Sequence, residues 1–126
     1  MLLLLHIGLA PRAFALLETT GRRTGKRRRT PVGNGLAGDV FWLVAETADG
    51  GYVRNLRAQP RVRVKVGGRW HSGTASFVED DDCLARRSRI DSGNGVIGRL
   101  DGMVFRASAR IAGNTPVTVR IQLEAG

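Results

Sequence analysis

The clearest indication of the fold is the stretch Arg-Val-Arg-Val-Lys-Val at residues 61–66. It is followed by Gly67-Gly68 and then by Arg-Trp-His-Ser-Gly-Thr-Ala-Ser-Phe-Val at residues 69–78. Strict alternation of cations and valines is typical of a β-strand, because successive side chains on a strand point to opposite faces. The valines are therefore expected to face a core and the cations to face outward. A Gly-Gly pair supplies a tight hairpin turn, so the stretch predicts two antiparallel strands.

Four more strands are predicted on the two sides of this hairpin. Residues 14–19 and 27–32 are expected to pair as a second hairpin across a glycine turn. Residues 40–45 are continuously apolar, which predicts a central strand buried on both faces. Residues 117–123 place an aliphatic side chain at every second position. Six strands with few helices favour a mainly β protein, a barrel in a single domain over residues 1–126, rather than a doubly wound sheet.

The predicted helices are short. Residues 51–59 have apolar side chains at helical spacing and stop before a proline. Residues 80–90 place three aspartates in the first turn and arginines toward the end, as the helix dipole favours. A third helix is expected at 95–113, and residues 1–12 are expected to form a short N-terminal helix. The apolar segment 1–10 is too short to span a membrane, which leaves a packing helix and an interfacial membrane anchor as alternatives.

A basic segment suggests the chemistry of the ligand. The formal net charge is +9, and six cations lie at residues 22–29, around the turn-forming Gly21 and Gly25. No acidic residue occurs between Glu18 and Asp39. Glycines allow a tight turn that presents N–H groups, and arginine forks grip phosphate or carboxylate oxygens in pairs. The segment predicts a ligand with several negative charges, while a nucleic acid, a phosphorylated cofactor and a merely solvated basic face all remain open.

Other motifs lack the context that their chemistry requires. The glycine pattern at 33–38 spells a dinucleotide fingerprint but leads into a strand, so a hairpin loop is expected there. The same pattern at 93–98 follows a helical segment and has no acidic residue about twenty positions later. Two histidines and the single Cys83 give no convincing metal site or nucleophilic triad. A lone cysteine is consistent with a reducing cytoplasm, and a reactive group, if there is one, is expected to come from a cofactor.

The motif Leu-Glu-Thr-Thr-Gly-Arg-Arg-Thr-Gly-Lys at 17–26, the strand end Val-Ala-Glu at 44–46 and Tyr-Val-Arg-Asn-Leu-Arg-Ala-Gln-Pro at 52–60 occur in this order. In these motifs, over about residues 14–78, the chain resembles the deazaflavin-dependent nitroreductase and quinone reductase family. The resemblance implies an FMN-binding split-barrel-like fold, binding of coenzyme F420, and hydride transfer from the reduced cofactor to a quinone or nitro acceptor. The sequence departs from the nitroreductase pattern in its C-terminal half, where pocket-forming aromatics are missing.

The resemblance also implies site residues. The basic loop would hold the phosphodiester and polyglutamate tail of F420, two strand segments would line its ring, and the start of the following helix would close over it. The candidate cofactor-binding residues are Arg22, Arg23, Thr24, Gly25, Lys26, Arg28, Thr30, Pro31, Val32, Ala45, Glu46, Thr47, Gly51, Tyr52 and Asn55. No general acid can be named among them.

Some of these assignments have structural alternatives. Tyr52 could be a core aromatic, and Asn55 could simply brace its helix. Arg27 and Arg29 should alternate to the face opposite Arg28 and are therefore left out of the site.

Three functional alternatives remain open beside the reductase. One is a split-barrel protein that binds FMN, and another is a carrier that holds F420 or a lipid without turnover. The third is a nucleic-acid-binding β-barrel, which is disfavoured because the four phenylalanines, two tryptophans and one tyrosine all lie outside the basic run. The expected partners are thus a small quinone or nitroaromatic acceptor and no nucleic acid. A homodimer and peripheral membrane contact through residues 1–10 are left open, and the expected location is the cytoplasm.

Overall fold

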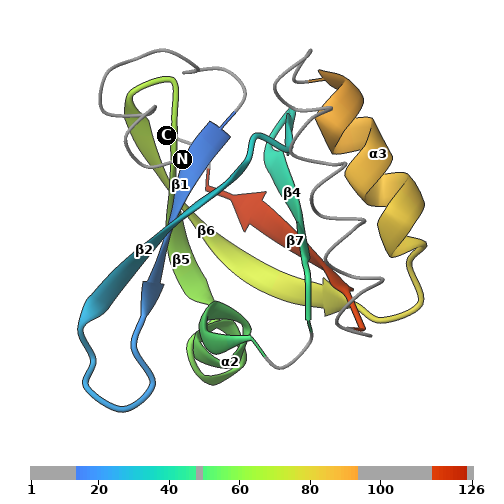
Figure 1. The fold of residues 1–126 in the computed structure, drawn as a ribbon. Helices are drawn as coiled ribbons and strands as arrows, with labels where there is room; N and C mark the ends of the chain where they lie inside the picture. Colours follow the sequence, from blue (N-terminus) through green and yellow to red (C-terminus); the bar gives the residue numbers. More distant parts are fainter. Residues whose placement is uncertain (1–13, 48–49, 94–114, 125–126) are drawn as a thin grey trace.

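The computed structural model describes residues 14–47, 50–93 and 115–124 (Figure 1). The described chain forms one antiparallel sheet with two helices. The helices predicted at 1–12 and 95–113 lie outside the described residues. The strands are β1 (Phe14–Thr20), β2 (Arg27–Gly33), β3 (Leu36–Ala37), β4 (Val40–Ala45), β5 (Arg61–Val66), β6 (Arg69–Val78) and β7 (Val117–Leu123), and the helices are α2 (Gly51–Ala58) and α3 (Cys83–Gly93).

The strands are ordered β2-β1-β5-β6-β7-β4-β3, and every neighbouring pair is antiparallel. The sheet curls so that β1 and β5 face β4 and β7 across the core, while α2 lies below one end of the curl and α3 lies outside β4 and β7 (Figure 1). This arrangement confirms the mainly β fold. Strand β3 was not among the six predicted strands, because two residues are too few to show an alternating pattern.

The hairpin of β5 and β6 forms as its sequence predicts. Val66 pairs with Arg69, and Gly67 and Gly68 between them have φ of 58° and 81°. Positive φ at both central residues is the geometry of a tight hairpin turn that L-residues with side chains avoid. Val62 and Val64 are buried in the core, as the alternation requires.

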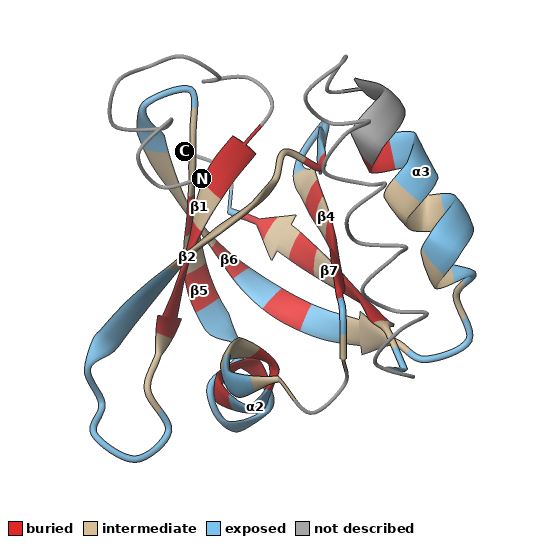
Figure 2. Cartoon of the chain, in the orientation of Figure 1, coloured by how far each residue is buried: buried red, intermediate tan, exposed pale blue. Residues whose placement is uncertain are grey.

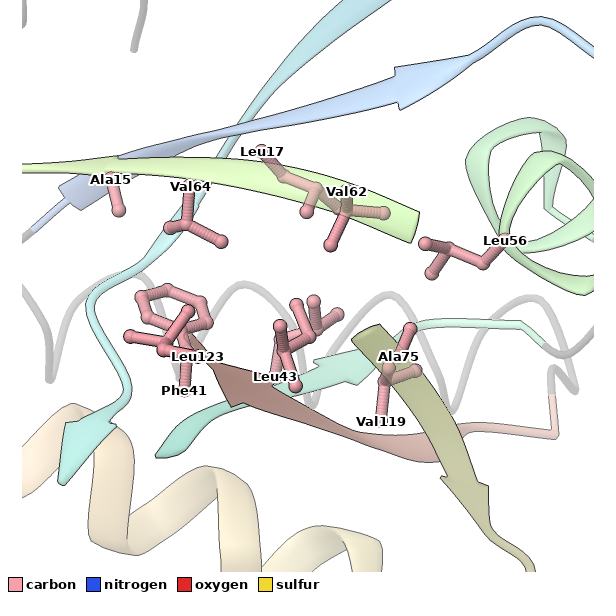
Figure 3. Packing of buried hydrophobic residues seen from close by; sticks show 11 residues of the cluster. Ala15, Leu17, Phe41, Leu43, Leu56, Val62, Val64, Ala75, Val119 and Leu123 are labelled. Carbon is pink, nitrogen blue, oxygen red and sulfur yellow. The ribbon is translucent and has the colours of Figure 1, made fainter. Parts of the chain in front are cut away.

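The core lies inside the curl. Side chains from β1 and β5, including Leu17 and Val64, point toward side chains from β4 and β7, including Leu43 and Val119 (Figure 3). Leu56 of α2 adds to one end of this cluster. In Figure 2 the buried residues follow the strands through the core, whereas the far end of the β1–β2 hairpin is exposed. The hairpin end is therefore available to a ligand.

The placement of β4 differs from the prediction. It is buried on both faces, but it lies between β7 and the short β3 rather than at the centre, which β6 occupies. Its inner side joins the main core, and its outer side carries Val44, which clusters with Ile90 of α3. Because α3 covers its outer face, β4 is apolar on both faces like a central strand, although it lies near the edge of the sheet.

The start of α3 also differs. The helix begins at Cys83, so the three aspartates precede it and its arginines lie in the middle. Asp82 accepts a hydrogen bond through Oδ1 from the Ala85 N–H (3.1 Å), and its carbonyl accepts from the Arg86 N–H (2.9 Å). These are the contacts of a helix N-cap. Asp82, which was expected inside the first turn, therefore caps the N-terminus of the helix instead.

No helix within the described ranges is long and apolar enough to cross a membrane.

Candidate cofactor-binding site

The loop between β1 and β2 is closed tightly by its glycines. The Gly21 N–H donates to the Lys26 carbonyl (2.7 Å), and the Gly25 N–H donates to the Gly21 carbonyl (2.9 Å). Gly25 has a φ of 69°, which favours glycine at that position. The loop holds Arg22 and Arg23 at the tip of the hairpin, as the sequence predicts.

Several N–H groups of the loop form hydrogen bonds within the protein. Besides the two glycine N–H groups, the Arg22 N–H donates to Asn55 Oδ1 (3.2 Å) and the Lys26 N–H donates to Thr24 Oγ1 (3.3 Å). These four N–H groups are engaged within the protein. These four groups are therefore not available to an anion, whereas the exposed arginine side chains of the loop are.

A groove of about 900 Å³ lies between the basic loop and the start of α2. Most of the residues predicted to hold the anionic tail line it, but Gly25 and Lys26 do not. Arg27 and Arg29, which were left out of the predicted site, also line it. The lining residues are Gly21, Arg22, Arg23, Thr24, Arg27, Arg28, Arg29, Thr30, Gly51, Tyr52 and Asn55.

Glu18 explains the orientation of the excluded arginines. Its carboxylate forms ion pairs with Arg29 (3.1 Å), Arg63 (2.9 Å) and Arg27 (3.8 Å). These contacts place the side chains of Arg27 and Arg29 on the outer face of the sheet. Arg28 is paired with the buried Thr19 and so lies on the other face. The predicted alternation is confirmed, although both outer arginines still contribute atoms to the rim of the groove.

The same contacts set the charge of Glu18, which is only 5% exposed. Hydrogen bonds from Arg63 lower the pKa of this carboxyl, burial opposes that effect, and the hydrogen bond from Arg29 adds to it. Glu18 is therefore ionised at neutral pH. Sequence reasoning missed its role; the available signal was a single carboxylate on a strand whose partner strand carries arginines at alternate positions.

A second cavity of about 360 Å³, here called the slot, adjoins the groove. Nine residues were predicted to line the ring or close over it. Asn55 lines the groove and not the slot. The other eight line the slot: Thr30, Pro31, Val32, Ala45, Glu46, Thr47, Gly51 and Tyr52. Six others also line it, namely Gly33, Leu43, Val44, Gly50, Arg87 and Ile90. The structure thus brings together four segments: residues 30–33, 43–47 and 50–52, and helix α3.

Groove and slot share Thr30, Gly51 and Tyr52. Tyr52 lies at the junction and packs against the core with its half-buried ring. Burial raises the pKa of its hydroxyl far above the ordinary value; the charge of Arg87 opposes this effect and that of Glu46 adds to it. Tyr52 therefore packs against the core and also lines both cavities, and its hydroxyl keeps its proton at neutral pH.

The half-buried Arg87 and the buried Ile90 reach the slot from α3. No local pattern predicted them, because their position depends on how α3 packs against the outer face of β4. Arg87 adds a cation to a slot that otherwise presents apolar side chains, glycines, threonines and Glu46. The slot can therefore accept a flat, largely apolar group that carries polar atoms at its edge.

Solved structures with the same fold support the architecture. An F420-H2 dependent reductase is 22% identical over 90% of this chain and 95% of its own, with a TM-score of 0.59. A domain-swapped dimer is 20% identical over 87% of this chain and 80% of its own (TM-score 0.60). A protein from Listeria innocua described as a pyridoxamine 5′-phosphate oxidase is 14% identical over 98% and 90% (TM-score 0.58). At these identities the similarity establishes the fold alone, and it confirms the split β-barrel.

Sequence comparison gives the family. No curated protein sequence matches the chain. The family model described as F420H(2)-dependent quinone reductase matches residues 7–94, which is more than half of the chain and includes both the basic loop and α3. This chain therefore belongs to the F420H(2)-dependent quinone reductase family.

Proposed function

We propose that this protein binds coenzyme F420 and transfers a hydride from the reduced cofactor to an electron-poor acceptor, a quinone or a nitro compound. The observation that carries the proposal is the continuity of a cationic groove with a less polar slot through Thr30, Gly51 and Tyr52. A ligand with a charged tail and a flat ring needs this combination. Family membership supports the same cofactor.

The groove fits the tail of F420 on chemical grounds. Five arginines line it, and none of its lining residues in the described part of the chain is acidic. Guanidinium groups bind phosphodiester and carboxylate oxygens through paired, charge-assisted hydrogen bonds. Arg23 and Arg28 are the residues that we assign to these contacts, because both are exposed and Arg28 lies on the face opposite Glu18.

The slot fits a ring. Val32, Leu43 and Ile90 offer apolar surface, and the strand end at Ala45 to Thr47 brings backbone polar groups to its edge. When bound, reduced F420 would supply the hydride. The chain itself would orient the acceptor, and Arg87 would stabilise negative charge that develops on an acceptor oxygen. The protonated Tyr52 hydroxyl offers a hydrogen-bond donor at the same place.

The proposal extends to partners and location. The acceptor is a small molecule, and a homodimer is the proposed assembly; the domain-swapped dimer of similar fold supports an assembly of this kind. We place the protein in the cytoplasm. Contact with a membrane surface through residues 1–10 would bring a lipid-soluble quinone within reach, and this segment lies outside the described residues.

Titration of the protein with F420 and with FMN, followed by cofactor fluorescence, tests the cofactor. F420 should bind more tightly, because its tail offers Arg23 and Arg28 a phosphodiester and several carboxylates, whereas FMN offers a single phosphate. Arg28→Ala should weaken F420 binding by about 1–3 kcal/mol, as expected for the loss of charge-assisted hydrogen bonds. The matched control is Arg61→Ala, since Arg61 pairs with Glu124 and lies outside the groove. Equal or tighter binding of FMN would favour the flavin alternative.

Turnover distinguishes a reductase from a carrier. Adding menadione or a nitroaromatic to the protein with reduced F420 should oxidise the cofactor faster than the same mixture without protein. Tight binding without acceptor-dependent oxidation would indicate the carrier instead.

A further inference from the structure

Asn55 is a polar residue in an apolar position. It lies on the inner side of α2, next to the core residue Leu56, and it is 7% exposed. A buried amide destabilises the fold unless its donor and acceptor are both paired. The partners of Asn55 therefore show what keeps it there.

The side-chain hydrogen bonds of Asn55 lead to the β1–β2 hairpin. Its Oδ1 accepts from the Arg22 N–H (3.2 Å) and from Arg22 Nη1 (3.0 Å), and its Nδ2 donates to Thr19 Oγ1 (3.4 Å). Arg22 Nη1 also donates to the Gly51 carbonyl at the start of α2 (3.4 Å). One buried amide thus joins the end of β1, the basic loop and α2.

We propose that Asn55 is a positioning residue that fastens the basic loop to α2 through Arg22 and does not itself contact the cofactor. Its Oδ1 already accepts two hydrogen bonds, which is the capacity of a carbonyl oxygen. Because Gly51 and Tyr52 of α2 line both cavities, fastening the loop to α2 sets the position of the groove relative to the slot.

Arg22 has a corresponding role. Its Nη1 and its backbone N–H are directed to α2, so it acts as the link between the two elements, and Arg23 and Arg28 remain the direct contacts for an anion. This assignment distinguishes Arg22, which links the loop to α2, from Arg23 and Arg28, although the sequence predicts the same role for all three. Only its consequence for cofactor affinity rests on the proposed function.

The chemistry of the amide provides matched variants. Asn55→Asp keeps the acceptor for Arg22 and adds a charge-assisted contact, but it loses the donor to Thr19. Asn55→Leu is of similar size and loses both. Thr19→Val removes only the partner of Nδ2. If the acceptor to Arg22 fastens the loop, Asp should substitute for Asn, whereas Leu should not.

Limited proteolysis of the ligand-free protein measures the fastening directly, because trypsin cuts after the arginines and lysine of residues 22–29. Loop cleavage should be roughly tenfold faster in Asn55→Leu, since the open loop becomes more populated, and near the wild-type rate in Asn55→Asp and Thr19→Val. Equal cleavage of Asn55→Leu and wild type would overturn the proposal. So would equally fast cleavage of the Leu and Asp variants.

Arg22→Ala approaches the same contact from the exposed loop and guards against a misfolded Asn55→Leu variant. It removes one trypsin site, yet cleavage at the remaining sites should rise as in Asn55→Leu, and the double variant should add little further. Thermal unfolding of each variant checks that the domain remains folded. A loop that is cleaved no faster in Arg22→Ala than in wild type would contradict the link.

F420 titration then tests the consequence for the groove. Asn55→Leu should bind F420 roughly tenfold more weakly, and Asn55→Asp should restore most of the affinity, because a displaced loop no longer presents its arginines together. If wild type itself fails to bind F420, the proposed function fails while the proteolysis result stands. If the loop opens and F420 affinity does not change, the positioning role is wrong.

Discussion

At the scale of single residues, Glu18 is the carboxylate on which the hairpin depends. It lies under Arg29 and Arg63, whose side chains also approach the Trp70 ring (5.1 and 4.6 Å from the guanidinium carbon to the ring centroid). One buried charge thus holds cations from β2 and β5 against each other. Without it, like charges would face one another across three strands.

Glu18→Gln should reduce the free energy of unfolding at neutral pH by about 1–3 kcal/mol, because arginine partners lose an ionised acceptor. The folded pKa of Glu18 is lowered below its ordinary value of 4.5. Its contribution is therefore fully present above that pH and is lost as the pH falls through the folded pKa. The difference between variant and wild type in urea unfolding should accordingly disappear in acid.

Glu79→Gln is the control for this experiment. Glu79 is 70% exposed and pairs with Arg57 at 3.7 Å, so its loss should change stability by no more than about 0.5 kcal/mol. If both variants behave alike, the cluster around Glu18 contributes nothing beyond an ordinary surface pair.

Tyr52 gives a prediction at alkaline pH. It is the only tyrosine in the chain, so phenolate absorbance reports it alone. Because burial raises its pKa above the ordinary value of 10, the unfolded chain loses this proton at a lower pH than the folded protein. Stability should therefore fall as the pH rises above about 10, and phenolate should appear only with unfolding. Tyr52→Phe should lack this part of the pH dependence; phenolate formation in the folded protein would show that the ring is solvated.

At the scale of elements, glycines fix the approach of neighbouring segments. A Cβ on Gly35 would lie 1.8 Å from the Trp42 carbonyl oxygen of β4, whereas one on Gly51 meets nothing within 4 Å. Gly35→Ala should thus destabilise the fold by more than 2 kcal/mol, roughly the level of a core defect, since backbone must move. Gly51→Ala should change stability little. Thermal unfolding of both variants compares them, and similar midpoints would mean that the segment before β3 adjusts freely.

The same glycines explain a misleading motif. The pattern at 33–38 resembles a dinucleotide fingerprint, but Gly35 is required by its contact with β4, and Gly38 has a φ of 63° in the turn from β3 to β4. The expected hairpin loop is only partly right: the segment contains β3, which pairs with β4, and the turn itself lies at Gly38 and Asp39. The prediction that this pattern is not a dinucleotide-binding motif was based on the order of elements. Such a motif must open a helix, and local patterns placed a strand after it.

Other features of the elements could not be read locally. Alternation identified β5 and β7, since a strand with one buried face carries its own signal. The position of β4 in the sheet and the start of α3 depend on tertiary contacts: the outer face of β4 is covered by α3, and Asp81 bonds to Thr118 of β7 (2.9 Å) and to Arg86. Because of these contacts Asp81 precedes α3, although the sequence pattern favours placing it in the first turn of the helix.

At the scale of the whole molecule, the slot was predicted better than the groove. The eight slot residues came from short motifs that lie at strand ends and at a helix start, where local structure fixes their direction. The anion-binding capacity of the groove depends on which arginines are engaged elsewhere. Arg27 and Arg29 form ion pairs with Glu18, and Arg22 donates a hydrogen bond to Asn55. Strand alternation already set Arg27 and Arg29 apart from Arg28. The contact between Arg22 and Asn55 joins residues 33 positions apart, so the sequence could not show that Arg22 is engaged.

The dependence of binding on salt tests the molecule as a whole. A protein that neutralises several phosphates of a nucleic acid loses affinity by orders of magnitude between about 50 and 200 mM salt. A cofactor whose ring lies in the slot should retain the part of its binding that comes from burial, because screening acts mainly on the exposed groove. F420 affinity should therefore fall less steeply across that range than affinity for single-stranded DNA, and Arg28→Ala should flatten the dependence on salt further. Tight, salt-sensitive binding of DNA, with no oxidation of reduced F420 by menadione, would instead identify the groove arginines as a polyanion-binding surface.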